Sequence, residues 1–130
     1  MLRQIKLMPD YQCWALWEDG PGYGNIDPET LPLRTTTRKQ LARWIEKFES
    51  RLDWSDPHKT KFKTSEEERR FGRWFEMRGI ALWRRLRIEL GAGYSIGYFS
   101  DRYQRMLSMN GSEYSEWVNR KRSAHRLRPT

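Results

Sequence analysis

The stretch TSEEERRFGRWFEMRGIALWRRLRIELG, residues 64–91, decides the fold, because it predicts one long amphipathic helix. Thr64 with Glu67, or Ser65 with Glu68, fits a capping box, in which the hydroxyl of the first residue accepts a hydrogen bond from a free N–H of the first turn. Gly91 is a typical stop signal after the last turn. Apolar residues recur at helical spacing between these two ends, and they are Phe71, Phe75, Leu82, Leu86 and Leu90, with Trp74, Ile80 and Trp83 beside them.

A shorter amphipathic helix is predicted before this stretch. Thr37 with Gln40 fits a second capping box, and an apolar stripe follows until Asp53–Pro57 ends the helix. Gly79 lies on the stripe of the long helix, where it predicts close approach of a neighbouring backbone. We expect the two helices to form a hairpin, and three tryptophans to fill the interface between the helices and a sheet: Trp44, Trp74 and Trp83.

Strand signals flank the helical pair. Residues 2–8 and 94–99 alternate between apolar and polar side chains, and the aromatic run 11–17 predicts a further strand that pairs with the first or continues it. Residues 18–33 predict a long irregular loop, 101–109 fit either a helix or a strand, and 112–118 predict a short helix. The fold class is therefore α+β, with a small antiparallel or mixed sheet packed by a two-helix hairpin. We expect one domain over residues 1–118 and a basic, flexible tail over 119–130.

The charge is strongly positive and unevenly distributed. The 130 residues carry a formal net charge of +8, although residues 1–33 hold two basic and five acidic side chains. A basic body favours an anionic partner. The single cysteine, the absence of a signal-peptide pattern and the absence of a long apolar run predict a cytoplasmic protein that does not bind membranes.

No pattern of catalytic residues stands out. Cys13 lies in an apolar run, where a free cysteine usually packs as a small hydrophobic side chain. His58 and His125 are too few for a usual zinc site. The glycine-rich run at 20–24 lacks the lysine of a phosphate-binding loop. The sequence thus predicts a protein that is not an enzyme, with no metal and no small-molecule cofactor.

Surface binding is the remaining class of function, because tryptophan and arginine are enriched at interface hot spots. We expect a protein partner to contact an aromatic and acidic set together with a basic set. The first set is Trp17, Asp19, Tyr23, Asp27 and Glu29, and the second is Lys59, Lys61, Lys63, Arg70 and Arg73. Nucleic-acid binding through the Arg/Lys-rich helix face, including Arg69, and through the basic tail is the alternative.

Several motifs resemble a group of small bacterial proteins. These motifs are GNIDPETLPL at 24–33, LARWIEKFESRLDWSDP at 41–57 and ELGAGYSIGYF at 89–99, so the resemblance covers roughly residues 1–99. Proteins of this type resemble the immunity proteins of polymorphic toxin systems, including contact-dependent growth inhibition. The resemblance implies a non-enzymatic protein that binds and neutralises a cognate toxin, and it carries no functional residue over to this chain.

Overall fold

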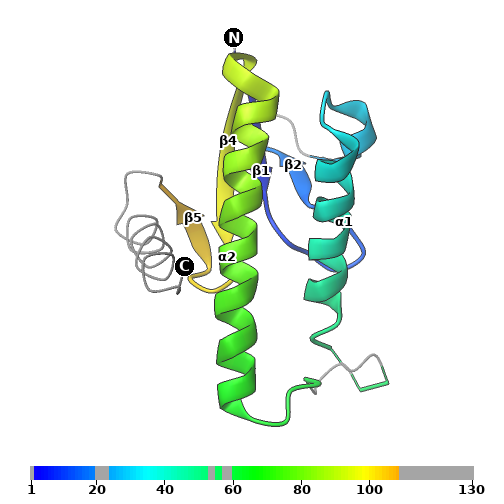
Figure 1. Ribbon diagram of the computed structural model, residues 1–130, viewed down its shortest axis with the longest axis vertical. Helices are drawn as coiled ribbons and strands as arrows, with labels where there is room; N and C mark the ends of the chain where they lie inside the picture. Colours follow the sequence, from blue (N-terminus) through cyan, green and yellow to red (C-terminus); the bar gives the residue numbers. More distant parts are fainter. Residues whose placement is uncertain (1, 20–23, 53–54, 57–59, 109–130) are drawn as a thin grey trace, which may run out of the picture.

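The computed structural model describes residues 2–19, 24–52, 55–56 and 60–108. This part of the chain forms a five-stranded sheet and two long helices (Figure 1). In chain order the elements are β1 (Arg3–Leu7), β2 (Leu16–Glu18), β3 (Asn25–Ile26), η1 (Pro28–Thr30), α1 (Thr35–Glu49), α2 (Ser65–Leu90), η2 (Gly91–Gly93), β4 (Tyr94–Ser100) and β5 (Arg105–Leu107). The α+β class is confirmed. The predicted helix at 112–118 and the tail at 119–130 lie outside the described residues.

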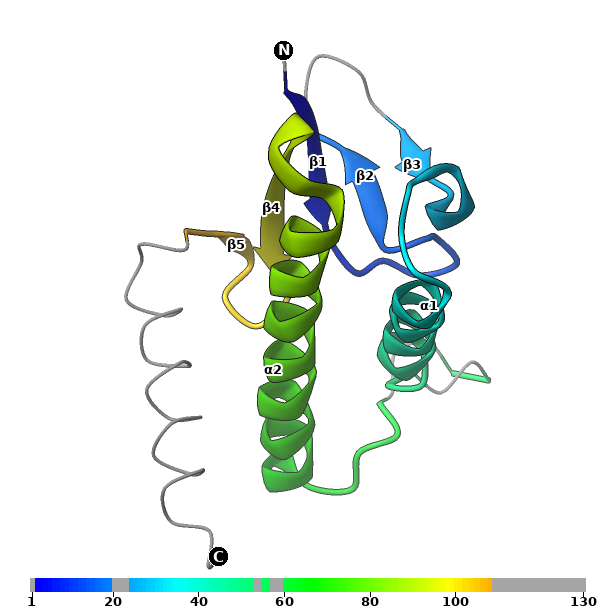
Figure 2. The same ribbon diagram turned by 45° about the horizontal axis from the view of Figure 1, so that its top comes forward.

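The sheet is mixed, with the strand order β3-β2-β1-β4-β5. The central strand β1 pairs parallel to β4, from Arg3 opposite Tyr94 to Leu7 opposite Tyr98, and every other pair is antiparallel. A parallel pair needs a long crossover, and here α1 and α2 form it. Figure 2 shows both helices on the same face of the sheet.

The core lies between this face and the helices. Ile5, Leu7 and Tyr98 point toward the helices and are fully buried. Trp44 of α1 and Trp83 of α2 are also buried, as predicted. The prediction for Trp74 is wrong, because its side chain is 37% exposed and lies beneath the Arg78 guanidinium at the edge of the apolar stripe.

The ends of α2 follow the sequence signals. The Thr64 hydroxyl accepts a hydrogen bond of 3.1 Å from the backbone N–H of Glu67. Gly91 ends the helix with a positive φ of 74°, which disfavours residues with a Cβ atom. Both local predictions for this helix are confirmed.

The predicted cap of α1 is wrong. The helix begins at Thr35, and Thr37 lies inside its first turn with a fully buried side chain. Glu89, near the end of α2, supplies the cap instead: one carboxylate oxygen accepts from the backbone N–H of Arg34 at 2.8 Å, and the other accepts from the Thr37 hydroxyl. A carboxylate suits this position because the helix dipole is positive there.

The segments between these elements also differ from the predictions. Residues 11–17 predict a strand, but β2 covers only Leu16–Glu18, and Gln12 has a positive φ of 59°. The predicted loop at 18–33 contains the short strand β3 and the turn η1. Of the ambiguous segment 101–109, the described residues 101–108 contain a turn, in which Gln104 has a positive φ, and then β5.

Candidate functional site

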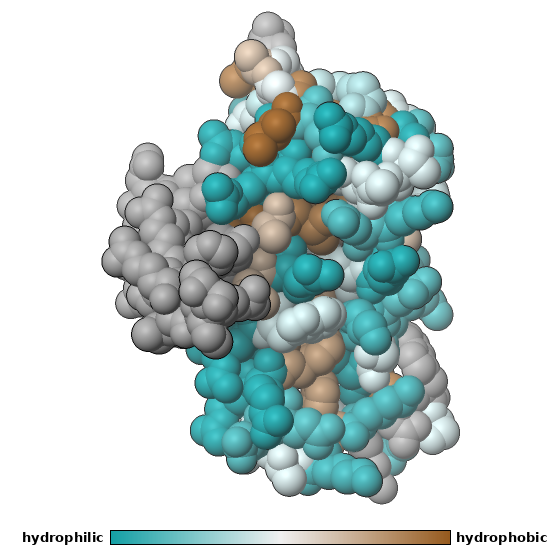
Figure 3. Space-filling model, in the orientation of Figure 1, coloured by the Kyte–Doolittle hydropathy of each residue, from teal (hydrophilic) through white to brown (hydrophobic). Residues whose placement is uncertain are grey.

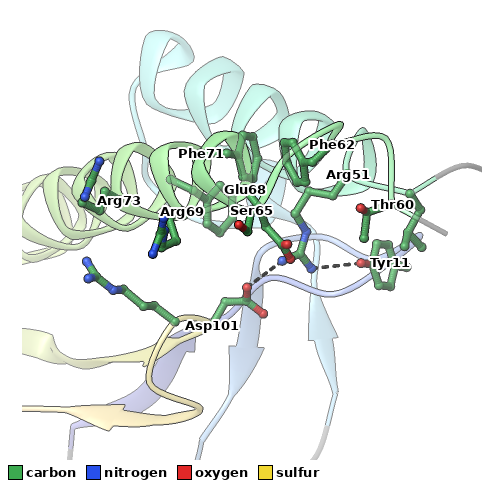
Figure 4. A pocket seen from close by; sticks show the side chains of 14 residues that line it. Tyr11, Arg51, Thr60, Phe62, Ser65, Glu68, Arg69, Phe71, Arg73 and Asp101 are labelled. Atoms are coloured by element: carbon green, nitrogen blue, oxygen red, sulfur yellow. Dashed lines mark hydrogen bonds and ion pairs between the residues drawn. The ribbon is translucent and has the colours of Figure 1, made fainter. Parts of the chain in front are cut away.

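A pocket of about 510 Å³ opens at the end of the molecule where α2 begins (Figure 4). Its wall comes from four separate segments: the β1–β2 connection with Tyr11, the α1–α2 connection with Arg51 and Phe62, the first turns of α2, and the β4–β5 turn with Asp101. A volume of this size falls within the roughly 300–1,000 Å³ of typical ligand pockets. The fold therefore gathers distant residues around one concavity.

Arg51 holds three of these segments together. Its guanidinium forms an ion pair of 2.8 Å with Asp101 and donates a hydrogen bond of 2.9 Å to the hydroxyl of Tyr11. The same group lies 4.0 Å from the ring centre of Phe48. These contacts fix Arg51 as a structural side chain whose positive charge is balanced by Asp101.

Arg69 and Arg73 form an unbalanced basic wall. They lie four residues apart on α2, so they face the same side of the helix, about 5–6 Å apart at Cβ. Both are exposed and line the pocket, and within the described part of the chain neither has an acidic partner. Arg102 adds a further positive charge from the β4–β5 turn. Two neighbouring like charges repel, so this wall favours a bound anion.

Aromatic rings form the apolar part of the pocket. Phe62 contacts Phe71 at a centroid distance of 5.2 Å, and Phe71 stacks on the buried Phe75 at 5.8 Å. The pocket thus combines cationic side chains with an apolar floor. This combination suits a ligand that carries both a negative charge and apolar surface.

A buried carboxyl, Glu76, lies on α2 directly after the pocket residue Phe75. Burial raises the pKa of Glu76, although the hydroxyl of Ser100 donates to it at 2.8 Å and opposes the shift. Burial and the adjacent Glu76 carboxylate also raise the pKa of Tyr98 well above its usual value. Raised pKa values occur at catalytic sites, but Glu76 is only 5% exposed and does not line the pocket. We therefore assign this group to the core.

The predicted basic residues lie near the pocket. Arg73 lines it, Arg70 pairs with Glu66 at 3.4 Å, and Lys61 and Lys63 belong to the segment that leads into α2. Lys59 lies outside the described residues. The basic set therefore gathers at one end of the molecule, which we call the basic end and define by Lys61, Lys63, Arg69, Arg70, Arg73 and Arg102.

The predicted acidic residues occupy another place. Asp27 accepts a hydrogen bond of 3.0 Å from the backbone N–H of Glu29, and Glu29 lies 3.8 Å from Arg38. This turn precedes α1, whereas the basic end follows it, and 15 helical residues separate them by about 22 Å (Figure 1). The two predicted sets do not form one surface.

Trp17 and Asp19 belong to a third region. Trp17 alternates with the buried Leu16 on β2, so it faces the side of the sheet away from the helices, and its indole donates to the carbonyl of Met8. The backbone N–H of Asp19 donates to the carbonyl of Gln4 on the neighbouring strand. Tyr23 lies outside the described residues.

Sequence reasoning missed most of the pocket. Arg51, Arg102 and Asp101 carry no local signal, because their importance comes from tertiary contacts between segments far apart in the chain. The sequence predicted a functional role for Arg69 only under the alternative of nucleic-acid binding. Its spacing of four from Arg73, with Phe71 between them and Phe75 beyond, is the one pattern that pointed to a shared basic and aromatic surface.

The described ranges contain no group of three or more His, Cys, Asp or Glu side chains arranged to hold a metal ion. They also contain no helix long and apolar enough to cross a membrane.

The fold and the site define a class: a small α+β protein whose clearest functional feature is a charged surface pocket. The face of the molecule seen in Figure 3 is mostly hydrophilic. The chain belongs to the family described as Serratia CdiI immunity protein-like, which matches residues 3–101. No curated protein matches the sequence significantly. The predicted resemblance to immunity proteins of contact-dependent inhibition is confirmed. Membership supports a toxin-neutralising, protein-binding role in general, and immunity proteins are in general not enzymes.

Proposed function

We propose that this protein neutralises a cognate bacterial toxin by forming a stoichiometric complex with it in the cytoplasm, without catalysis. The observation that carries the proposal is the basic end, where Arg69 and Arg73 line a pocket and make no ion pair with the described residues, in a member of an immunity-protein family. Arginine and aromatic side chains grouped around a concavity are typical of binding hot spots.

The basic end is the better docking surface of the three regions. Asp27 and Glu29 already serve local structure, as a cap and as a partner of Arg38. Trp17 and Asp19 remain candidates for a second contact on the face of the sheet away from α1 and α2. Arg73 instead lines the pocket, and Lys61, Lys63 and Arg70 are exposed next to lining residues in the chain, so a partner can bury Arg73 together with apolar rings. This arrangement resembles a hot spot more closely than isolated surface charges do.

Nucleic-acid binding, the alternative, gains no support from the family. The same charges attract phosphates, however, so the experiment includes it as an outcome. Phosphate contacts weaken steeply and predictably with salt, whereas a shape-complementary protein complex is less sensitive.

The test uses the full chain and, as the candidate toxin, the C-terminal domain of a large secreted protein whose gene lies immediately upstream in the native host. Size-exclusion chromatography with light scattering and calorimetry should show a one-to-one complex, and co-expression should protect cells from the toxin. Lys61→Glu with Lys63→Glu should weaken the complex. Lys39→Glu with Arg43→Glu, which makes the same change on the exposed face of α1, should not. Absence of both a complex and protection would refute the proposal.

A further inference from the structure

The pocket at the basic end has a charge imbalance that the described residues do not correct. Its lining includes four arginines but only two acidic side chains, Glu68 and Asp101. Asp101 is already bound to Arg51 at 2.8 Å. The positive charges of Arg69 and Arg73 therefore remain available to a ligand.

The distribution of polar and apolar atoms limits the chemistry of that ligand. A free small anion would use the arginines but leave the rings of Phe62 and Phe71 without a partner. A purely apolar side chain would cover the rings but bury cationic groups without compensation, which is unfavourable. A protein segment with a carboxylate next to an apolar or aromatic side chain satisfies both parts. Arginine also binds carboxylates in a fork of two parallel hydrogen bonds.

We propose that the pocket receives an acidic segment of the toxin, with a glutamate or aspartate side chain placed between Arg69 and Arg73 and a neighbouring apolar side chain against the phenylalanine rings. This inference rests on the proposed function, and it adds which part of the partner enters and what its chemistry is. Association should then be steered by charge and the complex held by the desolvated contact.

Two arginines on the same helix give a matched comparison. Arg73→Glu reverses a charge in the pocket wall. Arg84→Glu makes the identical change 11 residues further along α2, at an exposed side chain outside the pocket lining. We expect Arg73→Glu, and likewise Arg69→Glu, to weaken toxin binding by about 30-fold or more, as for a desolvated charge contact. Arg84→Glu should change the Kd by less than about threefold, as expected for a rim charge.

Charge exchange identifies the chemistry directly. A scan that replaces each glutamate and each aspartate of the toxin by arginine should yield one variant that loses affinity for the wild-type chain and regains it with Arg73→Glu. If the wild-type chain binds the toxin and Arg73→Glu binds equally well, the pocket assignment is wrong while the proposed function stands. If the wild-type chain does not bind the toxin, the proposed function itself fails.

A short peptide tests the proposed chemistry of the ligand. NMR signals of the arginine Nε–H groups should shift with a capped Glu-Phe-Glu peptide and not with Gln-Phe-Gln.

Two other occupants of the pocket, a nucleic acid and a segment of this chain itself, are distinguished by separate measurements. Stronger displacement by a DNA or RNA oligonucleotide than by the toxin would overturn the inference in favour of nucleic acid. The segment SEYSEW at 112–117 has similar chemistry within this chain. If Glu113→Gln with Glu116→Gln moves the Arg73 signal before toxin is added, the occupant is internal and the inference fails.

Discussion

Replacing Gly79 by alanine should destabilise the protein, although alanine is the better helix former. A Cβ atom at this position would lie 2.5 Å from the Tyr98 hydroxyl and 2.7 Å from the Trp44 ring. Both rings are held in place: the Trp44 indole donates to the carbonyl of Phe75 at 3.1 Å, and Tyr98 stacks on Trp83 at a centroid distance of 5.4 Å. The sequence predicted close approach of a backbone here, and the structure places two side-chain rings there instead.

The magnitude follows from two opposing contributions. Alanine in a helix interior gains about 1 kcal/mol over glycine. Overpacking a dense core costs about 1–3 kcal/mol, and contacts below 3.0 Å with two fixed rings put Gly79→Ala at the upper end. We therefore expect a net loss of about 2 kcal/mol in the free energy of unfolding.

Gly72 provides the matched control for this measurement. It lies on the same helix, and no atom comes within 4 Å of an added Cβ. Gly72→Ala should therefore stabilise the protein by about 0.5–1 kcal/mol. Urea unfolding of both variants, followed by circular dichroism, measures the difference, and the change in the unfolded chain is the same in each. A Gly79→Ala variant as stable as Gly72→Ala would refute the packing argument.

Three further predictions concern caps and buried carboxyls. Glu89→Gln should cost about 1–3 kcal/mol at neutral pH, because Glu89 caps α1. Burial alone would raise the pKa of Glu89, but hydrogen bonds from Thr37 and Arg34 and the Arg85 ion pair lower it, so this stability should be lost as pH falls through the folded-state pKa. For Glu76 the pH dependence of stability is opposite. Because its pKa in the folded protein is raised from the usual value of 4.5, wild-type stability should fall as the pH rises above 4.5. Glu76→Gln should remove this fall, as measured by thermal unfolding at several pH values. Thr64→Ala should cost about 1 kcal/mol in urea unfolding and leave toxin binding unchanged.

Local patterns predicted α2 and its ends because the deciding interactions are local. Thr64 binds a backbone group three residues away, and Gly91 adopts its positive φ within a single turn. The alternation of apolar and polar residues in β1 and β4 likewise predicts which face of each strand is buried. It does not record that the strands are parallel, because pairing depends on the crossover that the two helices complete.

The cap of α1 shows why a local pattern can mislead. Thr37 and Gln40 fit a capping box as well as Thr64 and Glu67 do. The cap residue is nevertheless Arg34, three residues earlier, because a carboxylate 55 residues away from Arg34 accepts a hydrogen bond from its backbone N–H. That carboxylate belongs to Glu89, which appears in the sequence only as a polar residue in the last turn of another helix. A tertiary contact therefore outweighed the local signal.

The sequence did not predict the pocket for the same reason, since tertiary contacts form it. Different residues of the pocket stabilise the fold and are available to bind a partner. Arg51 and Asp101 hold the segments together and are already paired, so replacing either should cost stability. Arg69 and Arg73 make no described ion pair and sit on an exposed helix face, so substitutions there should leave the fold intact. In the complex that we propose, this division would let the residues that contact the toxin change while the scaffold that positions them stays the same. The comparison of Arg73→Glu with Arg84→Glu tests it directly, since both variants should unfold alike and only the first should lose the partner.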